Sequence, residues 1–253
     1  MNTTTSVSIT AAQKQQYQEE GYFILERAIP ENHLEILRGE AQNFIDKIHA
    51  EMDRQGKDVL GINHRNKRYF ISNRYKESPR LEEVLFSDLM ADICRATLGP
   101  DAFLFYEQYV IKAAEVGMKF AWHQDSGYVG HPHKRYVSCW CALDDMTLDN
   151  GTIFILPYSR AGTKEMVPHV QEKHTNDMVG YHGTDPGIPA IIPAGSIAVF
   201  SSTCFHRSGA NATKNMRRAY LAQFSPEPIR SKDGVGLAGL ADPFLKNGIS
   251  TRQ

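Results

Sequence analysis

The feature that most constrains the fold is a change in hydrophobic patterning near residue 102. Before this point, apolar residues recur every three or four positions, the spacing of helices that bury one face. After it come short apolar runs separated by Gly, Pro, Asp and Asn, a pattern typical of antiparallel strands joined by turns. Helices followed by strands predict an α+β fold, in which N-terminal helices buttress an antiparallel sandwich or barrel.

Capping and breaking residues place the individual elements. Thr10 followed by Gln13 forms a capping-box pattern, which predicts the start of a short helix. A strand is expected at residues 22–25, and two further helices are expected after Pro30 and after Ser87. The strands expected in the second part of the chain are residues 103–106, 108–112, 136–143, 152–156, 188–192, 196–200 and 218–224.

The whole chain, residues 1–253, is expected to form one domain. Residues 1–100 are predicted to be the mainly helical buttress, and residues 101–228 the strand-rich core. Residues 229–253 are expected to be a C-terminal tail. Residues 159–186 contain several Gly, Pro and His without a clear period, so we expect a lid there, because a loop of that length is usually functional.

Composition and charge argue against several classes of protein. The net charge of −1 argues against nucleic-acid and membrane partners, which favour a basic surplus. No apolar run approaches the length of a membrane span, and the first residues lack the regions of a secretory signal. Four cysteines are too few for a disulfide framework, so we expect a protein of the reducing cytoplasm. Cys139 and Cys141 are expected to be small apolar side chains that face a core. The sequence does not indicate an oligomeric state.

Two separated segments could together bind a metal ion. His123 and Asp125 form a His-x-Asp motif, and on a strand two residues at this spacing project to the same face. His206 lies far downstream, at the end of an apolar segment. Two His and one carboxylate form the facial triad of non-haem iron(II) oxygenases, although this donor set does not exclude zinc or manganese. Alternatively, His123 could be a core histidine that is hydrogen-bonded to Asp125.

A third position makes the metal-site interpretation more specific. Arg217 follows His206 by eleven positions, at the start of the next strand-like run. A guanidinium can bind a carboxylate through two parallel hydrogen bonds, so Arg217 could hold the distal carboxylate of a 2-oxo diacid. Ser208 shares a strand face with His206 and could donate its hydroxyl to the same carboxylate. A metal hydrolase has no need of such an arginine.

These motifs resemble those of the phytanoyl-CoA dioxygenase family. The resemblance implies a double-stranded β-helix, which is a jelly-roll or cupin-like barrel. It also implies that Trp140 lies beside the co-substrate, although Trp140 could equally be a plain core aromatic. It further implies iron(II) on His123, Asp125 and His206, and 2-oxoglutarate on Arg217 and Ser208. The segments that carry the resemblance are Trp122-His123-Gln124-Asp125, Asp149-Asn150-Gly151-Thr152 with Pro157, and His206-Arg207-Ser208-Gly209-Ala210-Asn211 together with Arg217.

The family often supplies a further basic or polar side chain for 2-oxoglutarate from an upstream segment. In this chain the candidates are Arg65, Lys67, Arg68 and Lys112, and the sequence does not choose among them for co-substrate or substrate. Residues 63–69 could equally form a solvated basic loop.

The sequence therefore predicts an oxidoreductase that uses iron(II), 2-oxoglutarate and O2. The expected reaction is hydroxylation or another oxidation of a small organic molecule, with release of succinate and CO2. The resemblance favours a hydroxylase over a halogenase, because related halogenases carry a small residue where this chain has Asp125. The alternatives are a non-catalytic or sensing barrel of the same fold, or a cupin-like metal isomerase or hydrolase. The primary substrate is not indicated.

Overall fold

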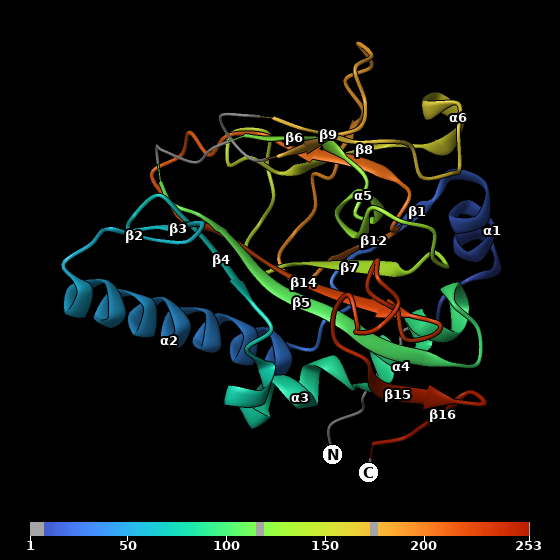
Figure 1. Cartoon of the computed structure of the whole chain (residues 1–253), viewed down its shortest axis with the longest axis horizontal. Helices are drawn as coiled ribbons and strands as arrows, with labels where there is room; N and C mark the ends of the chain where they lie inside the picture. Colours follow the sequence, from blue (N-terminus) through green and yellow to red (C-terminus); the bar gives the residue numbers. More distant parts are fainter. Residues whose placement is uncertain (1–7, 115–118, 173–176, 253) are drawn as a thin grey trace.

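The computed structural model describes residues 8–114, 119–172 and 177–252. Two antiparallel sheets form its centre, and most of the helices lie on the outer side of the larger sheet (Figure 1). The larger sheet has ten strands, with β15 (Asp242–Lys246) and β16 (Ile249–Ser250) off its main path. The strands on that path are, in order, β1 (Tyr22–Leu25), β12 (Ile197–Ser201), β7 (Val137–Ala142), β14 (Arg217–Ser225), β5 (Ala102–Lys112), β4 (Arg68–Ser72), β3 (Asn63–His64) and β2 (Val59–Leu60).

The smaller sheet has four strands and faces the larger one (Figure 1). Its order is β11 (Ile188–Pro189), β8 (Ile153–Leu156), β13 (Phe205–Ser208) and β6 (Phe120–His123). The helices and remaining short elements are α1 (Ala11–Glu20), α2 (Glu31–Gln55), η1 (Tyr75–Glu77), α3 (Pro79–Leu85), α4 (Asp88–Thr97), α5 (Ser126–Val129), α6 (Tyr158–Ala161), β9 (Val170–Gln171) and β10 (Met178–Val179). No described helix is both long and apolar enough to cross a membrane.

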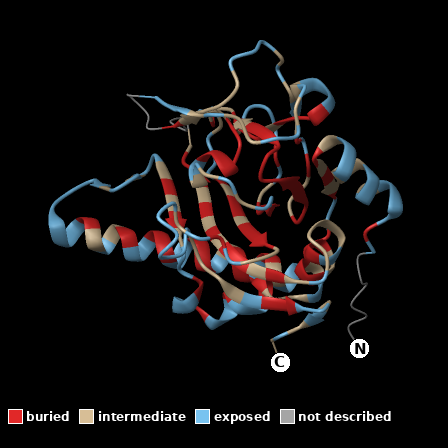
Figure 2. Cartoon of the chain, turned by 45° about the vertical axis from the view of Figure 1, so that its right-hand side comes forward, coloured by how far each residue is buried: buried red, intermediate tan, exposed pale blue. Residues whose placement is uncertain are grey.

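The two faces of the larger sheet belong to different cores. On the outer face, Cys139 and Cys141 are fully buried in the cluster that also contains the apolar side of α2. On the inner face, Trp140 packs in a second cluster with Ile153 and Ile155 of the smaller sheet. Figure 2 shows the buried central strands beside the exposed outer side of α2. The expected orientation of the two cysteines is confirmed, and both thiols are free.

The α+β arrangement of helices followed by antiparallel strands is confirmed. The capping box is also confirmed, because Thr10 Oγ1 accepts a hydrogen bond from Gln13 N at 3.2 Å while Gln13 Oε1 accepts one from Thr10 N at 2.9 Å. In the described part of the chain, no strand pair joins the two sheets into one closed barrel. The double-stranded β-helix therefore stays a prediction.

The prediction of separate strands at 103–106 and 108–112 is wrong, because β5 is continuous through Glu107. The side chain of Glu107 is fully buried, and its carboxylate accepts hydrogen bonds from the backbone N–H groups of Arg74 and Tyr75. These bonds offset the cost of burying a carboxylate, so a polar residue does not interrupt the strand.

Two other expectations are incomplete, because the larger sheet has strands that the sequence did not indicate. Residues 1–100 also contain β4, which pairs with the end of β5 and has Arg68 opposite Lys112. Exposed basic residues around this strand obscured its apolar alternation. Residues 229–253 are not merely a tail, because β15 pairs with the start of β5.

The predicted lid at 159–186 contains the short pair β9 and β10 and the end of α6. Residues 173–176 of this segment lie outside the described residues. Its function as a lid remains a prediction.

The loop before β8 depends on a glycine that two substitutions can test. Gly151 has φ +77°, and a Cβ there would lie 2.5 Å from Gly209 O; Gly162 has φ +73° and open space. Gly162→Ala should cost about 1–2 kcal/mol for the left-handed conformation, whereas Gly151→Ala should cost about 1–3 kcal/mol more through overpacking. Urea unfolding of both variants measures this difference, and equal losses would contradict the close approach.

Candidate metal centre

Three side chains converge between the two sheets. Nε2 of His123 and Nε2 of His206 lie 3.8 Å and 3.6 Å from Oδ1 of Asp125. The two imidazole centroids are 4.1 Å apart, and all three residues are buried. Antiparallel pairing of β6 with β13 sets His123 directly opposite His206. Within the described ranges, no other group of three His, Cys, Asp or Glu side chains has its donor atoms all within 4.8 Å of one another.

The reason given for this convergence from the sequence is wrong in one respect. β6 ends at His123, and Asp125 has helical backbone angles, φ −58° and ψ −36°, immediately before α5. Strand alternation therefore does not direct its carboxylate. A strand-to-helix turn brings Asp125 to the site, and the orientation of its side chain must be set by other contacts.

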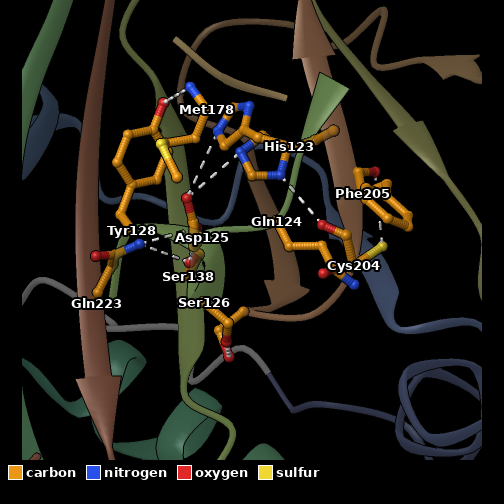
Figure 3. Close-up of polar contacts among 12 residues, drawn as sticks. His123, Gln124, Asp125, Ser126, Tyr128, Ser138, Met178, Cys204, Phe205 and Gln223 are labelled. Carbon is orange, nitrogen blue, oxygen red and sulfur yellow. Dashed lines mark hydrogen bonds and ion pairs between the residues drawn. The ribbon is translucent and has the colours of Figure 1, made fainter. Parts of the chain in front are cut away.

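Two residues of the larger sheet hold that carboxylate. Ser138 Oγ donates to Asp125 Oδ2 at 2.5 Å, and Gln223 Nε2 donates to the same oxygen at 2.8 Å (Figure 3). Oδ1 is thereby the oxygen that faces the two imidazoles. Sequence reasoning missed both residues, because their proximity to Asp125 depends on the packing of the two sheets.

The imidazoles are held in the tautomer that a metal ligand requires. Nδ1 of His123 lies 2.8 Å from Ala121 O, and Nδ1 of His206 lies 3.2 Å from Cys204 O. Because a carbonyl only accepts, each Nδ1 carries a proton, and in a neutral imidazole Nε2 then has the lone pair that a metal ligand needs. Burial, with a smaller effect from His206, lowers the pKa of His123 well below its usual range, which favours the neutral form.

The alternative of an ordinary core histidine does not fit this geometry. At 3.8 Å, His123 Nε2 and Asp125 Oδ1 are too far apart for a hydrogen bond. Two imidazoles and one carboxylate oxygen around a common point suit iron(II), and also zinc or manganese.

A cavity of about 570 Å³ opens from this cluster. Trp140 is 4% exposed and lies in the cavity wall, as expected from its position on the inner face of β7. Aromatic side chains form most of the apolar wall, and they are Phe70, Phe105, Tyr106, Phe120, Tyr128, Tyr136, Trp140 and Phe200.

Basic side chains form a row at one end of the larger sheet. Arg68, Lys112 and Arg217 are paired in register across β4, β5 and β14. Lys112 is 3% exposed and lines the cavity; its Nζ donates to Ser208 Oγ at 2.8 Å and to the carbonyl of Gly209. Burial and the charge of Arg217 lower the pKa of Lys112 well below its usual range, and Asp177 offsets this only in part.

Arg217 is deeper than expected. It is 1% exposed and is not among the residues of the cavity wall, although Ser208 and Arg68 are. Its Nη1 and Nη2 donate to Val110 O at 3.2 Å and Gly151 O at 3.0 Å, while Nε has no hydrogen-bond partner among the described residues. Burial lowers the pKa of Arg217 to about 10, so it is still cationic at neutral pH.

The other basic candidates differ in whether they line the cavity. Arg65 forms ion pairs with Asp53 at 2.5 Å and Asp58 at 2.8 Å, and neither Arg65 nor Lys67 lines the cavity. Arg68 does line the cavity, and its guanidinium lies 5.6 Å from the ring centroid of Phe70.

One histidine of the predicted lid, His169, contacts the segment that carries the metal cluster. His169 Nε2 accepts a hydrogen bond from the backbone N–H of Gln124 at 2.9 Å, and Gln124 lies between the two residues of the His-x-Asp motif. It is therefore a structural contact of this segment and not a member of the metal cluster. His174 lies outside the described residues.

Comparisons with known proteins agree with this arrangement. A family model described as phytanoyl-CoA dioxygenase (PhyH) matches residues 17–219. The peroxisomal phytanoyl-CoA dioxygenase of Mus musculus is 24% identical, over 90% of this chain and 72% of that protein. Ectoine dioxygenase of Sphingopyxis alaskensis is 23% identical, over 68% of this chain and 56% of that protein.

Two solved structures share the fold. EctD from S. alaskensis with 2-oxoglutarate and 5-hydroxyectoine has a TM-score of 0.67 at 21% identity, covering 90% of this chain and 80% of that chain. The non-heme alpha ketoglutarate dependent carbocyclase SnoK from nogalamycin biosynthesis has a TM-score of 0.70 at 15% identity, covering 97% and 98%.

Removing either imidazole should remove metal binding. His123→Ala and His206→Ala should each lower iron(II) affinity by more than the roughly ten- to hundredfold loss typical of changes around the ligands. Anaerobic calorimetric titration of the metal-free protein measures this affinity. His33→Ala, a half-buried histidine of α2, is the control and should bind as the wild type does. Tight iron(II) binding by His206→Ala would remove His206 from the ligand set.

Proposed function

The chain belongs to the phytanoyl-CoA dioxygenase family, and we propose that it is a 2-oxoglutarate-dependent non-haem iron dioxygenase that hydroxylates, or otherwise oxidises, a small organic molecule. The His-Asp-His cluster and the adjoining aromatic cavity support this proposal. So does the structural neighbour described as complexed with 2-oxoglutarate. The two facing sheets would be the halves of the family's double-stranded β-helix, in a single domain.

The observation that carries the proposal is the pair of buried cations beside the metal cluster. Lys112 and Arg217 are almost fully buried; among the described residues they donate to neutral oxygens, and Asp177 offsets the burial of Lys112 only in part. Burying two positive charges side by side is costly unless an anion compensates them. The distal carboxylate of 2-oxoglutarate would supply that negative charge, with Ser208 as a further donor.

The roles of the residues follow from their contacts. Nε2 of His123, Nε2 of His206 and Oδ1 of Asp125 would hold iron(II). Lys112, Ser208 and Arg217 would hold 2-oxoglutarate, and Trp140 would wall the co-substrate from solvent. Bound iron(II) and 2-oxoglutarate would use O2 to oxidise the substrate, with succinate and CO2 formed from the co-substrate.

The aromatic wall would serve the reaction by keeping water out. Its rings surround the space in front of the metal cluster, and exclusion of water limits side reactions of a reactive oxidant. A cavity of about 570 Å³ is within the usual range for small-molecule sites.

The alternatives differ in what they require. A cupin-like isomerase or metal hydrolase would use the same three ligands, but its reaction would not require an anion beside the two buried cations. A sensing barrel would bind iron(II) and 2-oxoglutarate without turnover. Substrate-stimulated release of succinate, screened over acyl-CoAs, amino acids, phosphonates and terpenoids, distinguishes an oxygenase from both.

Replacing Lys112 should separate stability from co-substrate binding. Lys112→Met removes a buried cation, so the ligand-free protein should be at least as stable as the wild type. The same change should raise the Kd for 2-oxoglutarate about ten- to hundredfold, the equivalent of ~1.5–3 kcal/mol for a hydrogen bond to a charged group. Thermal unfolding and anaerobic titration of the iron(II) form measure the two effects.

Two arginine variants complete that experiment. Arg217→Leu should also weaken 2-oxoglutarate binding. Arg218→Leu should not, because Arg218 is turned away and pairs with Asp144 at 2.6 Å. An unchanged Kd in both Lys112→Met and Arg217→Leu would reject the proposed carboxylate site.

The outcome of turnover should be oxidation without halogenation. Asp125 provides an anionic oxygen at the position that a halide would need, so a halide has no place among the ligands. Mass spectrometry of a reaction run in excess chloride, with the first substrate that stimulates succinate release, should find no chlorinated product. A chlorinated product from the unmutated protein would exclude Asp125 as a metal ligand.

A further inference from the structure

The metal cluster lies between the two sheets, and Asp125 is its only member that is not on a strand. His123 and His206 are cross-strand partners within the smaller sheet. Asp125 follows the end of β6 in a helical conformation, and its carboxylate extends toward the larger sheet. The orientation of the Asp125 carboxylate therefore depends on its contacts with the larger sheet.

Two residues of the larger sheet donate hydrogen bonds to the Asp125 carboxylate. Ser138 of β7 and Gln223 of β14 are cross-strand partners, 0% and 4% exposed. Both donate to Oδ2 of Asp125, at 2.5 Å and 2.8 Å, and Gln223 Nε2 also lies 2.9 Å from Ser138 Oγ (Figure 3).

The hydrogen atoms of this triangle can be assigned without ambiguity. A carboxylate only accepts, so the amide group of Gln223 must present Nε2 to Asp125. Nε2 donates to Oδ2 and also lies within donor distance of Ser138 Oγ. The Ser138 hydroxyl, which receives that bond, has its single hydrogen directed to Oδ2. Each member of the triangle thus fixes the orientation of the next.

We propose that Ser138 and Gln223 are positioning residues that restrict Asp125 to a single metal-binding oxygen, Oδ1. With both oxygens free, the carboxylate could turn and bind the metal through two oxygens, which would occupy a position that the co-substrate or O2 needs. Because Oδ2 is engaged by two donors, the carboxylate contributes one oxygen and the remaining positions stay open. This inference rests on the proposed function.

Single and double substitutions test the pair. Ser138→Ala and Gln223→Leu should each weaken iron(II) binding to the metal-free protein by about ten- to hundredfold, without 2-oxoglutarate present. The double variant should lose less than the product of the two single losses, because both residues act on the same oxygen. The visible absorption of bound Co(II), which responds to the number and geometry of its ligands, should change in all three variants.

Two control variants separate positioning from a general effect on the sheet. Ser225→Ala removes another fully buried hydroxyl of β14, one that has no hydrogen-bond partner among the described residues, and should bind both metals as the wild type does. Ser138→Thr keeps the hydroxyl donor and should retain most of the affinity and the wild-type Co(II) spectrum. Circular dichroism and thermal unfolding establish that each variant is folded, and if Gln223→Leu does not fold, Ser138→Ala decides.

The outcomes distinguish this inference from the proposed function. Wild-type affinity and an unchanged Co(II) spectrum in folded Ser138→Ala would overturn the positioning role and leave the proposed function standing. A wild-type protein that binds no iron(II) would overturn both.

Discussion

The antiparallel pairing of β6 with β13 is the constraint on which the site depends. It places His206 directly opposite His123, so both imidazoles leave the smaller sheet on the same side. A shift of one residue would move His206 to the opposite face, because successive side chains of a strand alternate. β13 also pairs with β8, and this second partner helps to fix its register. The close approach of Gly151 to Gly209 follows directly from that second pairing.

The larger sheet carries the buried cations Lys112 and Arg217. The inner face of β5 presents Tyr106, Gln108, Val110 and Lys112 to the cavity, since alternate residues share a face. Lys112 lies at the end of this row with Arg217 beside it, whereas Ser138 and Gln223 lie farther along the sheet and contact Asp125. The basic end and the carboxylate-binding pair are thus held apart by one rigid surface, which leaves room between them for a small ligand.

The contacts of Asp125 and those of Lys112 and Arg217 are all buried. In a low-dielectric environment, an uncompensated cation or carboxylate is costly, so each must find a specific partner. Asp125 accepts hydrogen bonds from two neutral donors and faces two imidazoles, whereas the described hydrogen-bond acceptors of Lys112 and Arg217 are neutral oxygens, with Asp177 and Asp144 acting on them through their charge. This excess of positive charge at the basic end supports the proposed binding of an anionic ligand there.

Local sequence signals determined the parts of this protein that depend on neighbouring residues. The caps at Thr10 and Ser87, the long apolar stripe of α2 and the short strands after residue 102 all follow from spacing and turn chemistry. The sequence also indicated His123, Asp125 and His206 as a group, because a His-x-Asp motif, a distal His and Arg217 eleven positions after it rarely coincide. Tertiary structure decided what spacing cannot encode: the continuity of β5 through Glu107, the addition of β4 and β15, and the approach of Ser138, Gln223 and Lys112 to the site. These residues are distant in sequence, and they meet only because strand register and the packing of two sheets bring their side chains to one buried point.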